Sequence, residues 1–345
     1  MNKHHLISAT FVLLTATEAS SDTQLYGDIL IRYEDEGNHI SLPPRERMRL
    51  IAHAGIKTQW TENWLTHFRL GTGLKNKQNV PGITIHRFSE QPQPDSDIFL
   101  ERAFIQGKGE NWKVEIGKVP WNNFQVTDIF WDGDLNPWGM NFNYEVSAQS
   151  TLYLSYYQPL DGNSDTIGDM SLIGFQWREK MGNWQLGITP WFVDYQGESN
   201  AQYATKDTQY DNQFLLLSAY AKYGMFKVGL DYGHSLDDFD YVANGKYSDQ
   251  KESVALEFAH GGLKSSGDWL IQFRLLKVER FGVVTEFAQN AVSPFATSNF
   301  KGVDLRIRRK MSPEWWLGMR FSDIQRIIEP LEEGYRFRIE GQYKF

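Results

Sequence analysis

Apolar and polar side chains alternate along most of this chain, and residues 335–345 show the pattern without a break. Tyr335, Phe337 and Ile339 would lie on one face of a strand, and Arg336 and Arg338 on the other, because successive side chains of a strand point to opposite faces. The apolar face of such a strand points inward in a soluble sandwich and toward lipid in a membrane barrel. One strand does not separate these two folds, so the rest of the chain has to.

The same alternation recurs through the chain and predicts about sixteen strands. They span 24–33, 47–60, 66–72, 97–108, 112–119, 140–146, 150–157, 170–178, 184–193, 213–223, 225–233, 253–260, 269–277, 302–309, 315–322 and 335–345.

The lengths of the connections alternate as well. Short turns at 61–63, 109–111, 147–149, 180–183, 223–224, 261–267 and 311–314 alternate with longer loops at 34–46, 75–96, 120–139, 158–169, 194–212, 234–252, 278–301 and 323–334. Short turns on one rim and long loops on the other are typical of an up-and-down transmembrane β-barrel. The sequence therefore predicts an all-β, antiparallel barrel with periplasmic turns, extracellular loops and an aqueous lumen.

The N-terminus predicts export. A short basic start precedes a mostly apolar run at residues 6–16, and Thr17 and Ala19 are small residues at the places that a signal peptidase reads. We expect a signal peptide at 1–19, a single barrel domain at 20–345, and a location in the cell outer membrane.

Composition removes several classes of function. The chain has no cysteine, which excludes a disulfide framework and a thiolate site. Its net charge of −8 argues against a nucleic-acid partner. Aromatic residues make up 14% of the chain, and most of its tryptophans flank the short turns, as in the aromatic girdle of a membrane barrel. These are Trp60, Trp64, Trp112, Trp177, Trp184, Trp269, Trp315 and Trp316.

The polar faces of the first three and last three strands are rich in arginine. The expected wall consists of Arg32, Arg47, Arg49, Arg69, Arg306, Arg308, Arg320, Arg336 and Arg338. Barrel closure would bring these strands together, and guanidinium groups bind carboxylates and phosphates, so the wall would favour anions. The alternative is that the arginines pair with inward acids such as Asp28, Asp304 and Glu340 and only stabilise the wall.

The loop at 120–139 carries Asp128, Asp132 and Asp134. If this loop folds into the lumen, its carboxylates face the arginines and form a constriction. Other acidic residues fall in the predicted outer loops, among them Glu34, Glu36 and Glu332. Those acids are expected on the solvated surface, where divalent cations can bridge them to lipopolysaccharide phosphates.

Three segments resemble a known family in the same order. They are Arg45-Glu-Arg-Met-Arg-Leu50, then Leu100-Glu-Arg-Ala-Phe-Ile105 with Gly117-Lys118, and above all Trp131-Asp-Gly-Asp-Leu-Asn-Pro-Trp-Gly139. Over about the first 145 residues the chain resembles the putative porins of Gram-negative bacteria. The resemblance implies a channel for passive diffusion of small hydrophilic solutes, surrounded by outer-membrane lipid and lipopolysaccharide. It also implies that the barrel-insertion machinery reads Phe345 at the C-terminus, and it admits a homotrimer as one assembly.

Other functions find less support in the sequence. A dedicated channel for an anionic oligosaccharide or polymer fits the arginine wall as well as a general porin does. A barrel hydrolase needs a catalytic group of His, Ser and Asn or Asp on one face, and the spacing of His234 and Ser248 within a long loop does not suit it. Asp132 and Asp134 resemble the start of a calcium loop, but Pro137 and Asn143 stand where glycine and glutamate are needed. We expect no catalytic residue, metal or cofactor.

Overall fold

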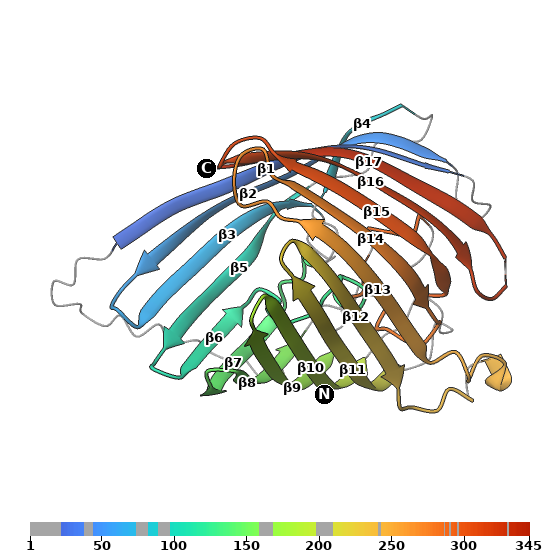
Figure 1. The fold of residues 1–345 in the computed structure, drawn as a ribbon, viewed down its shortest axis with the longest axis horizontal. Helices are drawn as coiled ribbons and strands as arrows, with labels where there is room; N and C mark the ends of the chain where they lie inside the picture. Colours follow the sequence, from blue (N-terminus) through green and yellow to red (C-terminus); the bar gives the residue numbers. More distant parts are fainter. Residues whose placement is uncertain are drawn as a thin grey trace, which may run out of the picture.

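The computed structural model is one closed β-barrel whose tilted strands follow one another around the wall (Figure 1). It describes residues 22–37, 44–73, 82–88, 97–158, 168–197, 210–240, 243–285, 287–289, 291–294, 297–329 and 331–345. The expected signal peptide at 1–19 therefore lies outside the described residues. None of the described segments forms a helix long and apolar enough to cross a bilayer.

The strands are β1 Asp22–Gly37, β2 Arg45–Gln59, β3 Trp64–Gly73, β4 Ile83–Arg87, β5 Asp97–Lys108, β6 Trp112–Lys118, β7 Trp138–Ser147, β8 Ser150–Gln158, β9 Asp169–Met181, β10 Trp184–Gly197, β11 Tyr210–Tyr223, β12 Phe226–Ser235, β13 Glu252–Gly261, β14 Trp269–Val278, β15 Phe300–Lys310, β16 Trp315–Arg326 and β17 Glu333–Lys344. A short helical turn at Ala243–Gly245 lies between β12 and β13.

Neighbouring strands pair antiparallel in chain order, and the sheet closes where β1 pairs with β17 from Asp28↔Lys344 to Gly37↔Tyr335. Among the described strands, the short strand β4 pairs with residues 47–50 near the start of β2, whereas β3 pairs directly with β5. Sixteen of the described strands therefore close the barrel, and the predicted fold is confirmed.

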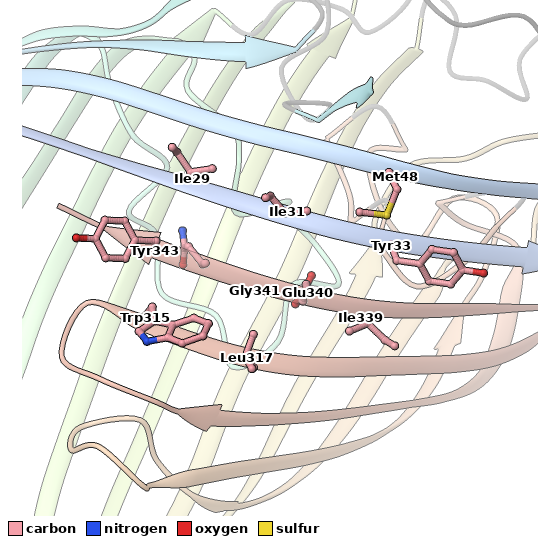
Figure 2. A pocket seen from close by; sticks show the side chains of 11 residues that line it. Ile29, Ile31, Tyr33, Met48, Trp315, Leu317, Ile339, Glu340, Gly341 and Tyr343 are labelled. Carbon is pink, nitrogen blue, oxygen red and sulfur yellow. The ribbon is translucent and has the colours of Figure 1, made fainter. Parts of the chain in front are cut away.

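The outer face of the barrel is apolar. Leu25, Phe68, Ile116, Ile173 and Ile339 are among the large apolar side chains exposed there. At the seam between the ends of the chain, apolar side chains of β1, β2, β16 and β17 surround a groove of about 470 Å³ (Figure 2). Such a surface is what a strand needs in order to face hydrocarbon.

One predicted girdle residue was misplaced. Seven of the eight tryptophans beside the short turns are exposed, as expected, but Trp316 is buried and packs with Leu30 and Ile51. Its neighbour Trp315 faces outward, and successive side chains of a strand cannot share a face. Trp316 therefore faces the interior.

The interior of the barrel contains an apolar core. It joins inward side chains of β5, β8 to β11 and β13 to β16 with side chains of two loops, at 119–137 and 279–299. Ile129, Phe130 and Trp131 come from the first loop, and Phe281 and Phe287 from the second. The core also reaches β14, β15 and β16 through Leu276, Val278, Phe300 and Ile324, which lie on the long-loop side of the arginines of those strands.

Phe345 completes the seam. Its backbone N–H donates to the carbonyl of Gly27 at 2.9 Å, and the N–H of Gly27 donates back to its carbonyl at 2.9 Å. The ring lies over Gly27, where a Cβ atom would approach it far inside contact distance.

We predict that deleting Phe345 lowers the folded, membrane-inserted fraction, because two backbone groups of β1 lose their partners in the seam. The measurement compares heated and unheated membrane fractions on a gel, since closed barrels migrate differently before unfolding. Phe345→Tyr, which keeps the backbone and the ring, should insert normally. Normal insertion of the truncated chain would contradict the prediction.

Candidate pore-lining site

Side chains on the inner face of β14 to β17, β1 and β2 form three cross-strand rows, all facing the lumen. The outer row is the nearest to the long-loop rim, the middle row comes next, and the inner row is the farthest from that rim. The outer row is Arg274, Asp304, Ser322, Arg336, Glu36 and Arg45. The middle row is Gln272, Arg306, Arg320, Arg338, Glu34 and Arg47. The inner row is Leu270, Arg308, Gly318, Glu340, Arg32 and Arg49.

Glu34 is the centre of the middle row. Its carboxylate accepts from Nε of Arg338 at 2.5 Å and from Nε of Arg47 at 2.7 Å, and it has no exposed surface. Arg49 reaches the same carboxylate at 3.9 Å. The sequence argument placed Glu34 on the solvated surface, which is wrong because β1 continues to Gly37 and carries Glu34 inward.

Glu36 has the same role one row further out. It is fully buried and pairs with Nη2 of Arg336 at 2.7 Å and with Arg45. Its surface assignment from sequence was wrong for the same reason. Glu332 is also buried, and it pairs with Arg326 at 2.5 Å.

The remaining wall arginines differ in how well they are paired. Arg32 meets Glu340 at 2.9 Å, and Arg320 binds Asp304 at 2.6 Å. Arg69, which lies beyond the rows on β3, meets Glu101 at 2.6 Å. Arg306 approaches a carboxylate only at 3.8 Å, and Arg308 stacks over the Trp316 ring at 5.0 Å.

The loop at 119–137 crosses the lumen from one wall to the other. On the β5 side, Arg102 donates to the Asn136 side chain at 2.6 Å. On the far side, the backbone N–H groups of Val126 and Thr127 donate to the buried carboxylate of Asp231 at 3.1 and 2.6 Å. The loop is therefore fixed at both ends of its span.

Asp128 connects the loop at 119–137 to the arginine rows. Its carboxylate lies 2.7 Å from Nη1 of Arg274, 3.8 Å from Arg306 and 3.9 Å from Arg320. Burial alone would raise the pKa of Asp128, but the three guanidinium groups outweigh burial and hold that pKa well below its usual range.

The two other loop acids do not pair with the rows in the same way. Asp132 is buried, and its carboxylate accepts from the backbone N–H of Asp134 at 3.0 Å, which shapes the loop itself. Asp134 is half-buried and lies in the field of Arg32 and Glu101. Burial raises the pKa of Asp134, Glu101 adds to this shift, and Arg32 opposes it.

The loop at 279–299 was not expected inside the barrel. The Val292 carbonyl accepts from Ser322 at 2.6 Å, and the Pro294 carbonyl accepts from Arg45 at 3.2 Å, both in the outer row. Its Phe287 carbonyl accepts from the N–H of Asp132 at 2.8 Å, which joins the two inward loops. The apolar segment Phe281-Gly-Val-Val284 was a usable signal, because an outer loop in water has no need of it.

Several lumen residues were missed for a simpler reason. Arg274, Glu257 and Arg102 lie inward on strands where the sequence argument had not looked for the wall. Strand alternation already indicates the direction of Arg274 and Glu257, whereas a bulge in β5 places both Glu101 and Arg102 in the interior. Arg274 binds Glu257 at 2.9 Å and stands at the β14 end of the outer row. No described group of three or more His, Cys, Asp or Glu side chains is arranged to hold a metal ion.

The comparisons with known proteins agree with this geometry. Residues 41–157 match the family described as putative porins. The match confirms the resemblance seen in the sequence, and it includes the inward loop that carries Asp128. No curated protein matches the chain.

Solved structures with the same fold are outer-membrane channels. OprB of Pseudomonas putida is 9% identical with a TM-score of 0.60, and the match covers 94% of each chain. OmpF of Salmonella typhi, solved in complex with daunomycin, is 10% identical with a TM-score of 0.58, and the match covers 94% of this chain and 97% of that one. OccK2 (OpdF) of Pseudomonas aeruginosa is 12% identical with a TM-score of 0.53, over 94% and 98%.

We predict that Glu34→Ala destabilises the barrel by roughly 3 to 5 kcal/mol, because it leaves buried guanidinium groups without their counter-charge. Urea unfolding in lipid vesicles measures this loss. Glu62→Ala, in an exposed short turn, is the matched control and should stay within about 0.5 kcal/mol of the parent protein. Equal stability of the two variants would show that the buried carboxylate is dispensable.

We further predict that Asp128→Asn gives a larger and noisier single-channel conductance, because the inward loop loses its charge contact with Arg274. In the parent protein the pKa of Asp128 lies well below its usual range, so the carboxylate is charged at pH 5, and the stability that the contact contributes is lost only as pH falls from about 4 toward the lowered pKa. The parent protein should therefore record alike at pH 7 and pH 5. Asp238→Asn, at an exposed outer loop, is the control. Unchanged conductance of Asp128→Asn would exclude the loop contact as a determinant of the pore.

Proposed function

We propose that this chain is an outer-membrane porin that forms a water-filled channel for passive diffusion of small hydrophilic solutes and favours anions. The observation that carries the proposal is the asymmetric lumen. Most side chains of the apolar core come from the two inward loops and from β8 to β11, whereas the inner faces of β14 to β17, β1 and β2 carry the arginine rows, so a passing solute would move along these rows.

A barrel of this size supports a channel on geometric grounds. Barrels of about eight strands fill with their own side chains, whereas sixteen strands enclose more space than inward side chains can occupy. In this protein, part of that space is taken by the loop at 119–137, which we propose as the constriction. Asp128, Asp132 and Asp134 lie on this loop.

The anion preference rests on the charges that remain after pairing. Glu34, Glu36, Glu340 and Asp304 offset much of the wall, but arginines still outnumber carboxylates in the three rows. Fixed positive charge in a low-dielectric tube concentrates anions and is only partly screened within a Debye length of about 10 Å at 0.1 M salt.

The rest of the proposal follows from the family match and the apolar outer face. The mature barrel of residues 20–345 would lie in outer-membrane lipid and lipopolysaccharide after export by the segment at 1–19 and insertion by the barrel machinery. It would act as a channel, with no catalytic role, and a homotrimer is the assembly to test first.

We predict an anion-selective reversal potential for single channels in a planar bilayer under a salt gradient. Changing both Arg47 and Arg49 to Ala should reduce the selectivity, because two lumen cations are removed. Arg309→Ala is the matched control, since Arg309 lies on the outside near the Trp269 ring at 5.2 Å. Cation selectivity of the parent protein would overturn the proposed preference, and a barrel that passes no current would overturn the channel itself.

A further inference from the structure

The arginines of the wall differ in whether they make a close polar contact. Arg32, Arg47, Arg69, Arg320, Arg336 and Arg338 each lie within 3.0 Å of a carboxylate oxygen. Arg49 is 3.9 Å from its nearest carboxylate but donates to the Gly82 carbonyl at 2.8 Å. Arg306 and Arg308 make neither kind of contact with the described residues, and both are inward residues of the same strand, β15.

Each of these two side chains has one buried donor without a partner among the described residues. The Nε atoms of Arg306 and Arg308 are buried and have no hydrogen-bond partner within the described part of the chain. The nearest carboxylate to Arg306 is Asp128, at 3.8 Å, which is beyond hydrogen-bond distance. Arg308 has only the face of the Trp316 ring, at 5.0 Å.

Two features of the wall leave the guanidinium group of Arg308 without a close carboxylate partner among the described side chains. The inner row has Gly318 between Arg308 and Glu340, so no side chain separates the two. A Cβ atom at position 318 would lie 2.8 Å from Cγ of Arg308, so a larger residue would displace that guanidinium. Glu340 acts on Arg308 electrostatically, but its close ion pair is with Arg32, at 2.9 Å.

Two guanidinium groups without a hydrogen-bonded carboxylate, about 7 Å apart along one strand, repel each other, and water can hydrate them but cannot neutralise them. An oxyanion can do both, because each guanidinium presents parallel N–H donors that match two oxygens of a carboxylate or phosphate.

We infer that Arg306 and Arg308 form a binding subsite for the oxyanion group of a small solute in the lumen. This inference rests on the proposed channel function and deepens it. It predicts that a solute with a carboxylate or phosphate group pauses at β15, whereas the paired arginines contribute only to the general field. Selectivity among anions would then be set by two residues and not by the whole wall.

The test records single-channel chloride current through the purified full-length barrel while propionate, inorganic phosphate or neutral propionamide is added. We expect concentration-dependent interruptions with propionate or phosphate and none with propionamide. Interruption by one oxyanion alone identifies the group that the subsite accepts. Interruption by neither overturns the inference.

Variants locate the effect. Arg306→Gln with Arg308→Gln should raise the half-blocking concentration about tenfold or more, which corresponds to the loss of one charge-assisted hydrogen bond. Arg308→Lys should lie in between, because it keeps the charge and loses the planar fork. Arg69→Gln is the matched control, since it removes an equal lumen charge from an arginine already paired with Glu101. If Arg69→Gln weakens the block as much, the subsite does not exist.

A second readout separates this inference from the channel proposal. Saturation-transfer NMR of propionate protons, with the protein in detergent micelles, reports binding without any current. Binding that depends on Arg306 and Arg308 in a barrel that passes no current would support the subsite and overturn the channel. Current without block and without saturation transfer would overturn the subsite and leave the channel. Unheated gel mobility confirms that each variant is folded.

Discussion

The pairing of β1 with β17 is the constraint on which the rest of this structure depends. In hydrocarbon, every backbone N–H and C=O has to find a partner within the protein, so a sheet with a free edge cannot cross a bilayer. The register from Asp28↔Lys344 to Gly37↔Tyr335 removes that edge. Because the sheet is closed, each strand has an inside and an outside, and strand alternation becomes a division between an apolar outer face and a charged inner one.

Closure also brings together residues that are far apart in the chain. Glu34 and Arg338 are directly opposite across the seam, as are Glu36 and Arg336. A buried carboxylate is costly unless it is paired, and these two are surrounded by guanidinium groups from β2 and β17. The seam is thus held by its backbone ladder and by charge pairs that exist only when the barrel is closed.

The lumen combines two opposing physical environments. On one side, apolar side chains of the two inward loops pack against the wall, so that loop backbone is buried by protein and not by water. The inner faces of β14 to β17, β1 and β2 carry the arginine rows, which the core meets at the long-loop ends of β14 to β16. Asp128 joins the two, because it belongs to the inward loop and binds Arg274 of the wall. This arrangement gives the passage a fixed position within a wide barrel.

The sequence by itself determined the number of strands, the short and long rims and the inward direction of the wall arginines, because each depends on a period of two that is local to a strand. Tertiary structure decided which arginines keep free donors. Arg338 and Arg306 look alike in sequence, yet one meets Glu34 across the seam and the other meets only a distant Asp128. Pairing of this kind depends on the register between strands and on where loops enter the lumen. The inward loop at 279–299 and the burial of Glu34 and Glu36 were decided in the same way, since neither can be derived from residues that are neighbours in the chain.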